Sequence, residues 1–555
     1  MKKELEIQTE IGRTLPPRGN DSSENATQLI EPLPTSSSAE YIVGEIRQHK
    51  FASVAALLIL LLTVGGLSFW YFGRHSVNIR QIESIAVMPF VNESGSADVE
   101  YLSDGMTETL ISSLSQIPKL NVKARSSVFR YKGKERDAQT VGKELNVQAI
   151  LNGNVVQRAS ELAVHIELVD AQTETILWST DYKRPMTNLV SLQSDIAHDV
   201  LQKLKTKLSA ADEQKLAKKY TENAEAYQLF LKGRFSWNQS TEESLKRSIE
   251  YYKLATEKDP NYALAYASLA DSYVMLGWDY RPPKEMLILA KEAATKALQI
   301  DESLASGHIS MGSVKLFLEW DWPGAKFEAE RAKAMNASYD AAIEMYTDYG
   351  DNHHFYCSYL DAIGLPNESI REIRTAKELD PLSPMHPFEL AFSYYYLRDY
   401  TTAMTEVGES LDSDPRFYMS YVLRGAILEQ KGMSDEAISA LYKAKSLEGG
   451  DAPLVLAELG YALGQAGKKA EAIKIIAELQ RRSKDMFIDP YNIGVIYIAL
   501  GDKDQAFTWL KKAYEEHSVQ MIYLNVEPKF DPIRSDPRFL DLERRIGLLI
   551  PADTE

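Results

Sequence analysis

The sequence predicts a multidomain protein in which a transmembrane helix is followed by an α+β domain and then by an all-α superhelix of helical hairpins. Three observations predict this fold class. Residues 51–73 carry no charge, residues 85–181 contain short runs with the two-residue period of strands, and residues 223–517 repeat a helical pattern. A chain of 555 residues, 45% hydrophobic and 25% charged, is long enough for several folded domains.

The amino-terminal part is predicted to lack folded structure up to the apolar stretch. Residues 1–50 are polar, rich in proline and serine, and without a sustained apolar period, so we expect them to be disordered. The apolar stretch begins at Phe51, has Leu61 near its middle and ends at Gly73. At 1.5 Å per residue it is long enough for a hydrocarbon core of about 30 Å, which predicts a transmembrane helix; the alternative is a buried core helix.

The next part of the chain, residues 79–212, is predicted to form the α+β domain. We expect strands at residues 85–90, 121–124, 147–156, 162–170 and 175–181, and helices at residues 104–117, 138–145 and 189–208. Ser103, Asp104 and Thr107 stand where the first of these helices is predicted to begin. We interpret them as capping residues, with a nucleophile as the alternative.

The repeat unit is clearest in the run YMSYVLRGAILEQKGMSDEAISALYKAKSLEG, which starts at Tyr418. It predicts two amphipathic helices, in which Gly425 and Ala437 let the backbones approach and Leu441 fills the space between them. The position of Ala437 recurs at steps of 34 or 35 residues as Ser369, Ala403, Ala472 and Ala506. We expect about eight such units at residues 223–517, followed by a capping segment at residues 518–555.

This unit resembles the tetratricopeptide repeat in its period and in its pairing of small with large residues. The preceding domain also resembles a known family. The runs SIAVMPFVNESGSADVEYLSDGMTETLISSL and LVDAQTETILWSTDY are similar to the TolB-type amino-terminal domain found beside tetratricopeptide repeats in bacterial membrane proteins. In that family the pair of domains follows a transmembrane helix and an effector such as a Ser/Thr kinase, an adenylate cyclase or a CadC-like regulator.

The resemblance therefore implies a sensor part, and it favours a bacterial inner-membrane protein with one span, a cytoplasmic amino terminus and most of the chain outside the cytoplasm. Basic residues are balanced at the two ends of the apolar stretch, so charge does not decide the orientation. No kinase motif occurs in the chain. We expect no catalytic residues, and the chain is not predicted to be an enzyme.

Composition argues against several kinds of ligand. A net charge of -17 argues against nucleic acid, because phosphate binding requires a basic surface. The single cysteine, Cys357, lies in an apolar aromatic stretch and is interpreted as a buried thiol rather than a nucleophile. His353 and His354 lack the partners that a metal site requires, so neither a metal nor a cofactor is predicted.

The candidate binding site is the inner surface that the first helix of each unit would line. Almost all residues predicted on this surface are uncharged, which suits a peptide with hydrophobic anchors. The aromatic candidates for this peptide groove are Phe388, Phe392, Tyr395, Tyr461 and Tyr491. The alternative is that these side chains pack on each other or on the terminal segment at residues 530–548.

The sequence thus predicts a membrane-anchored, non-catalytic scaffold or sensor that binds a protein or peptide partner through the repeat groove. The alternative is a regulatory subunit, or the split-off sensor part, of a Ser/Thr kinase or cyclase signalling system.

Overall fold

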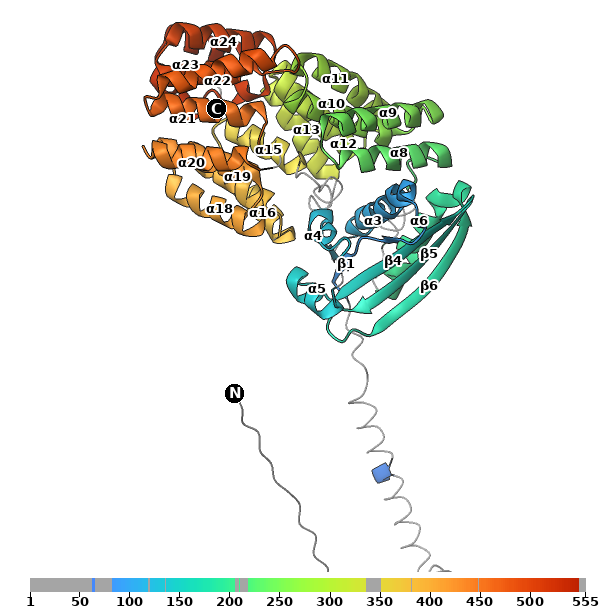
Figure 1. The fold of residues 1–555 in the computed structure, drawn as a ribbon. Coiled ribbons are helices and arrows are strands. Elements are labelled where there is room, and N and C mark those ends of the chain that lie inside the picture. Colours follow the sequence, from blue (N-terminus) through green and yellow to red (C-terminus); the bar gives the residue numbers. More distant parts are fainter. Residues whose placement is uncertain are drawn as a thin grey trace, which may run out of the picture. The chain divides into compact units, whose positions relative to one another are not determined.

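The computed structural model describes residues 62–64, 82–117, 120–134, 136–204, 209, 218–335, 351–380, 382–447 and 449–548. The strands and helices given below belong to one compact unit, Gln81–Glu555. This unit contains a small sheet domain followed by an array of helical pairs (Figure 1).

The sheet has the strand order β3-β1-β4-β5-β6, with β2 also paired to β4. Its strands are β1 (Ser84–Val87), β2 (Val91–Asn92), β3 (Asn121–Val122), β4 (Ala149–Arg158), β5 (Glu161–Asp170) and β6 (Ile176–Pro185). Strand β1 is parallel to β3 and β4, whereas β4, β5 and β6 form an antiparallel meander. Alternate side chains of β5 are buried because successive residues of a strand point to opposite faces.

The sheet domain also contains helices. They are η1 (Ala97–Val99), α3 (Glu100–Ser115), α4 (Arg125–Phe129), α5 (Ala138–Leu145), η2 (Met186–Asn188) and α6 (Leu189–Lys203). Helices α3 and α6 contact each other, and they contact the sheet at β4 and β6 respectively (Figure 1). Helix α5 has the bounds expected from sequence because the Asp137 side chain accepts from the Thr140 amide at its start, and Asn146 adopts a left-handed conformation (φ 52°) at its end.

The capping role predicted for Ser103, Asp104 and Thr107 is wrong. Helix α3 begins at Glu100, so all three residues lie inside the helix. Thr107 Oγ1 accepts from the amide of Phe90, and Asp104 forms an ion pair with Lys132 (Nζ–Oδ1 2.6 Å). The side chains of Asp104 and Thr107 therefore tie the helix to neighbouring segments and do not close its first turn.

The repeat array consists of antiparallel helix pairs, each of which contacts the next (Figure 1). The pairs are α8 (Ala224–Trp237) with α9 (Glu242–Lys258), α10 (Ala263–Asp279) with α11 (Pro283–Ile300), α12 (Ala305–Val314) and η3 (Lys315–Glu319) with α13 (Trp322–Met335), α15 (Asp351–Ala362) with α16 (Pro366–Leu379), α17 (Met385–Tyr396) with α18 (Tyr400–Ser413), α19 (Tyr418–Gln430) with α20 (Ser434–Lys445), α21 (Pro453–Gln465) with α22 (Lys469–Arg482), and α23 (Pro490–Leu500) with α24 (Lys503–Glu515).

Close approach of the two helices in a pair depends on small residues. In the pair α19–α20, a Cβ atom placed on Gly425 would lie 2.7 Å from Cγ of Leu441. Ala437 and Ala444 of α20 are fully buried. Glycine is therefore required at residue 425 because the leucine of the second helix occupies the space that a side chain would need.

The carboxy-terminal part folds back onto the array. It contains η4 (Val519–Tyr523), η5 (Pro528–Ile533) and α25 (Pro537–Arg545). Helix η5 contacts α23, and η4 contacts α15. The Trp322 Nε1 atom of α13 donates to the carbonyl oxygen of Ile546 (2.7 Å), so this segment reaches earlier pairs of the array as well.

The predicted fold class requires one correction, which concerns the transmembrane helix. No helix within the described residues is long and apolar enough to cross a membrane. Helix α11, for example, has 18 residues but carries Lys284, Lys291 and Lys296. Phe51, Leu61 and Gly73 of the predicted transmembrane helix lie outside the described residues. The fold that the structure shows is a mostly helical repeat array with a small sheet domain.

The absence of a spanning helix among the described residues also corrects the predicted location in the bacterial inner membrane. A single-pass inner-membrane protein requires a spanning helix, and the described ranges of the chain provide none.

Candidate functional site: a pocket on the inner face of the array

The candidate site is a pocket lined by the first helices of successive pairs. Its walls come from α15, α17, α19, α21 and α23, together with Trp278 of α10, Ile373 of α16, residues of η4 and η5, and Glu527 between them. The space between the lining side chains amounts to about 960 Å³, open solvent at its mouth included.

Four of the five aromatic residues predicted for the peptide groove line this pocket: Phe388, Phe392, Tyr395 and Tyr491. Tyr461 is not among the lining residues. It is buried, its ring centroid lies 5.8 Å from Nζ of Lys529, and its hydroxyl accepts from Nε2 of Gln465. The carboxy-terminal segment covers the part of the inner surface to which Tyr461 belongs.

The aromatic side chains of α17 form one continuous wall. The rings of Phe388 and Phe392 meet edge to face with centroids 5.2 Å apart, and Phe392 meets Tyr396 in the same way at 5.5 Å. Tyr396 stacks on Tyr523 of η4 with centroids 5.4 Å apart. These contacts fix the rings in place, so the apolar wall is formed before any ligand arrives.

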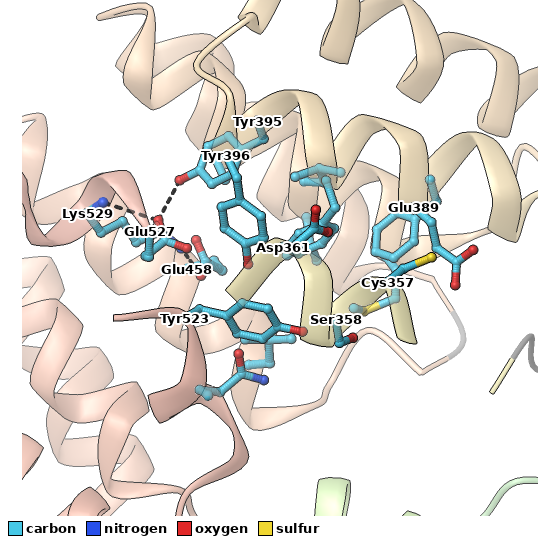
Figure 2. A pocket seen from close by; sticks show the side chains of 18 of the residues that line it. Cys357, Ser358, Asp361, Glu389, Tyr395, Tyr396, Glu458, Tyr523, Glu527 and Lys529 are labelled. Carbon is cyan, nitrogen blue, oxygen red and sulfur yellow. Dashed lines mark hydrogen bonds and ion pairs between the residues drawn. The ribbon is translucent and has the colours of Figure 1, made fainter. Parts of the chain in front are cut away.

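A buried ionic cluster lies at one side of the pocket (Figure 2). Lys529 Nζ lies 2.5 Å from Oε1 of Glu458 and 4.0 Å from Oε2 of Glu527. The Tyr395 hydroxyl donates to Oε1 of Glu527 (2.7 Å). Burial lowers the pKa of Lys529, but the two carboxylates outweigh it and hold that pKa above its usual value. Lys529 is therefore charged and already neutralised by its neighbours.

Two further buried acids, Asp361 and Glu389, line the pocket away from Lys529 (Figure 2). Asp361 Oδ2 accepts from the hydroxyl of Ser393 at 3.0 Å, whereas Oδ1 has no hydrogen-bond partner within the described residues. Glu389 lies 3.5 Å from Nδ1 of His386. Burial raises the pKa of Asp361 well above its usual value, although the hydroxyl groups of Ser393 and Ser369 oppose that change.

Cys357 also lines the pocket, and its surroundings favour the buried-thiol interpretation over a nucleophile. It is 3% exposed, and burial raises its pKa well above the usual value. A nucleophilic cysteine needs the opposite shift, because the thiolate is the reactive form.

No metal site is found in the part of the chain that the structure describes. The side chains of His353 and His354 lie outside the described residues.

The charged residues of the pocket were not predicted from the sequence. The predicted inner surface was nearly uncharged, but Asp361, Glu389, Glu458, Glu527 and Lys529 all line the pocket and are buried. Glu389 directly follows Phe388, which was predicted to lie on the inner surface. An acidic residue in the pocket could therefore have been predicted if the residues next to the predicted surface positions had been included.

The stacked helix pairs and their inner pocket define a helical-repeat protein. Within this class, residues 420–451 and 491–516 match the family described as tetratricopeptide repeat, which covers the pairs α19–α20 and α23–α24. The chain therefore contains tetratricopeptide repeats. Residues 81–199 match the family described as HilA/YgeH-like transcriptional regulator, second domain. The resemblance of this domain to the TolB type stays a prediction.

Among curated proteins, the chain is similar to a putative adenylate cyclase 3 of Rhizobium meliloti (strain 1021). The two are 32% identical over 252 residues, which are 45% of this chain and 42% of the relative. The match thus spans less than half the length of that protein. This similarity contradicts the prediction that the chain is not an enzyme, since the relative bears the name of an enzyme.

Among solved structures, the chain is similar to PilF of Pseudomonas aeruginosa, with 17% identity over 40% of this chain and 90% of that one and a TM-score of 0.30. It is also similar to a thermophilic tetratricopeptide-repeat protein of Thermus thermophilus, with 16% identity over 44% and 97% of the two chains and a TM-score of 0.25. At these TM-scores the likeness carries no argument about this chain.

Proposed function

We propose that the chain is a protein-interaction scaffold or sensor whose repeat array binds a peptide segment of a partner protein in the pocket on its inner face. The observation that carries this proposal is the aromatic wall of Phe388, Phe392 and Tyr396, which lines the pocket. An apolar side chain of a peptide that entered this space would leave water and contact several rings at once.

The tetratricopeptide repeats support the same function, because stacked helix pairs offer an extended inner surface for a peptide. The predicted groove residues belong to this proposal, with one difference. Tyr461 is covered by Lys529 and would contact a peptide only if the carboxy-terminal segment moved away.

A peptide library displayed on phage tests the proposal with the purified full chain as target. We expect the selected peptides to share a hydrophobic or aromatic anchor, and we expect Phe392→Ala to weaken their binding by roughly 30-fold, which corresponds to about 2 kcal/mol for a central aromatic contact. Binding is measured by isothermal titration calorimetry.

The control is Phe327→Ala on α13, where the side chain is 55% exposed and outside the pocket lining. It should leave the affinity unchanged. If both variants bound the selected peptides as tightly as the wild-type chain, the pocket would not be the binding site.

The similarity to a putative adenylate cyclase supports a second candidate function, in which the chain belongs to a cyclase signalling system. The amount of cyclic AMP in cells that express the chain, compared with cells that carry an empty vector, tests this function. We expect the amount to change on expression. An unchanged amount, together with no formation of cyclic AMP from ATP by the purified chain, would count against it.

A further inference from the structure

We propose that the free edge of the sheet is a self-association surface, at which β6 of one chain pairs antiparallel with β6 of a second copy. Strand β6 (Ile176–Pro185) stands last in the strand order, and among the described strands it pairs with β5 alone (Figure 1). A strand in this position offers one side of its backbone to another strand. Such a pair is separate from the pocket and would form with or without a bound peptide.

The backbone groups on the free side of β6 belong to alternate residues. The amide of Met186 donates to the carbonyl oxygen of Ser160 (2.8 Å), so the backbone at residue 186 faces β5. Because the hydrogen-bonding direction alternates along an antiparallel strand, the even-numbered residues at 180–184 face β5 as well. The amides and carbonyl groups that face away from the sheet are therefore those of Ser179, Asp181 and Lys183.

Helix α6 packs against a face of β6 and leaves this edge open. The Tyr182 side chain is buried, and its hydroxyl donates to Oδ2 of Asp199 on α6 (2.6 Å). Arg184 does reach the edge, where its Nη1 atom donates to the carbonyl oxygen of Lys183 at 3.1 Å. This bond is exposed to water, and the amide of a second strand could replace it.

The charges on the outer face of β6 are complementary to themselves. Asp181 and Lys183 stand two residues apart, so their side chains lie on the same face of the sheet. Both are exposed, and Asp181 remains 75% exposed although it lies 2.9 Å from Nδ1 of His165. If a two-fold axis passes through Tyr182, Asp181 of each copy lies directly opposite Lys183 of the other. Opposite charges in directly opposed positions favour strand pairing.

The charges also select this register over its neighbours. An axis at Asp181 would place the two copies of that carboxylate opposite each other, and like charges in this arrangement oppose pairing. An axis at Thr180 would place Ser179, and not Lys183, opposite Asp181. The axis at Tyr182 is therefore the one that joins each acid to a base, and it does so between residues whose backbone groups are free to hydrogen-bond.

Charge reversal in the full chain tests this pairing. Asp181→Lys and Lys183→Glu each bring like charges face to face in a pair of identical chains. We expect each variant to raise the dissociation constant of the pair at least about tenfold. An equimolar mixture of the two variants should associate about as tightly as the wild-type chain, because both positions of the mixed pair join an acid to a base. Sedimentation velocity over a range of protein concentrations measures the association.

The controls separate pairing from folding and from net charge. Asp435→Lys on α20 makes the same charge change at an 88% exposed side chain outside the sheet, and it should leave the dissociation constant unchanged. The double variant Asp181→Lys, Lys183→Glu exchanges the two charges within one chain, so it should pair with itself like the wild-type chain. Circular dichroism shows that each variant is folded.

Hydrogen exchange locates the contact within the chain. We expect the amides of Ser179, Asp181 and Lys183 to exchange more slowly at high than at low protein concentration, whereas the amides of Thr180 and Tyr182, which face β5, should not respond. A wild-type chain that stays monomeric at every concentration would overturn the inference. Association that neither charge reversal weakens, a mixture that fails to associate, or exchange at these three amides that does not depend on concentration would overturn it equally.

Discussion

Lys529 of the carboxy-terminal segment forms a buried ion pair with Glu458 of α21, with Nζ and Oε1 2.5 Å apart. Both side chains are almost completely removed from water. The segment that follows the last helix pair therefore inserts a charged side chain between the first helices, where a repeat array could hold a peptide from another protein. Tyr491 adds an edge-to-face contact with Phe530 of the same segment.

Breaking this pair should destabilise the protein strongly. We expect Lys529→Met to lower the free energy of unfolding by about 3–5 kcal/mol, because Glu458 would be left as a buried charge without its partner. The measurement is urea denaturation followed by circular dichroism. The double variant Lys529→Met, Glu458→Met should recover part of the loss, since it removes the closer carboxylate and leaves only Glu527 without the ammonium group. Equal destabilisation of the single and double variants would contradict this account.

Much of the local structure could be predicted because local signals dominate it. The period of 34 to 35 residues locates the helix pairs, since each pair is one unit whose apolar faces need a neighbour. The helix expected at residues 138–145 is observed as α5 with the same bounds, because Asp137 and Asn146 mark its two ends by capping.

Contacts between segments far apart in the chain could not be predicted from the sequence. Asp361 and Tyr523 line the same pocket although 162 positions separate them, and no periodicity relates their helices. Similarly, Asp104 was interpreted as a capping residue because its side-chain oxygens could accept from amides at a helix start, whereas its partner Lys132 lies 28 residues further on. Pairing of this kind depends on how the elements pack, which a one-dimensional pattern does not contain.

The spacing between the helices of a pair leads to a second prediction. Gly425→Ala should lower the free energy of unfolding by about 1–3 kcal/mol, because the new methyl group would overlap with Leu441. Gly408→Ala is the matched control. Gly408 lies inside α18 with nothing within 4 Å of an added Cβ atom, so the same substitution should stabilise the protein by about 0.5–1 kcal/mol. Opposite shifts of the two urea midpoints are expected. A shift of the same sign in both would show that helix propensity, and not the space between helices, decides the effect.

The buried carboxyl group of Asp104 leads to a prediction about pH. Burial raises its pKa from 3.8 to about 6, in spite of the ion pair with Lys132. The folded state therefore holds the proton more tightly than the unfolded state, and stability falls as the pH rises from about 4 to about 6. A pKa difference of about 2 units corresponds to a decrease of roughly 3 kcal/mol in the free energy of unfolding over this pH range. The variant Asp104→Asn has no carboxyl group at this position and should not show this decrease. Denaturation of both proteins at several values between pH 4 and pH 7 measures this difference. A constant difference across that range would show that Asp104 does not titrate there.

The last prediction concerns Glu108, which joins the sheet domain to the first helix of the array. Its side chain is buried in α3, where it contacts Arg125 of α4 at 2.5 Å and Arg234 of α8 at 2.8 Å. Burial raises the pKa of Glu108, but the two guanidinium groups outweigh it and hold that pKa below its usual value of 4.5. The stabilisation that this shift represents is therefore present above about pH 4.5 and is lost as the pH falls through the folded-state pKa.

We expect Glu108→Gln to lower the free energy of unfolding at pH 7 by about 3–5 kcal/mol, because two largely buried arginines would lose their carboxylate. The control is Glu243→Gln on α9, which removes an exposed ion pair with Arg247 and should cost at most about 0.5 kcal/mol. Urea denaturation at pH 7 and pH 4 distinguishes the two variants. The loss in Glu108→Gln should begin to shrink at the lower pH, because below about pH 4.5 the unfolded wild-type chain binds a proton at Glu108 that the folded state does not yet bind. A loss of the same size at both values, or one no larger than that of Glu243→Gln, would mean that Glu108 does not hold α3 to α8 by its charge.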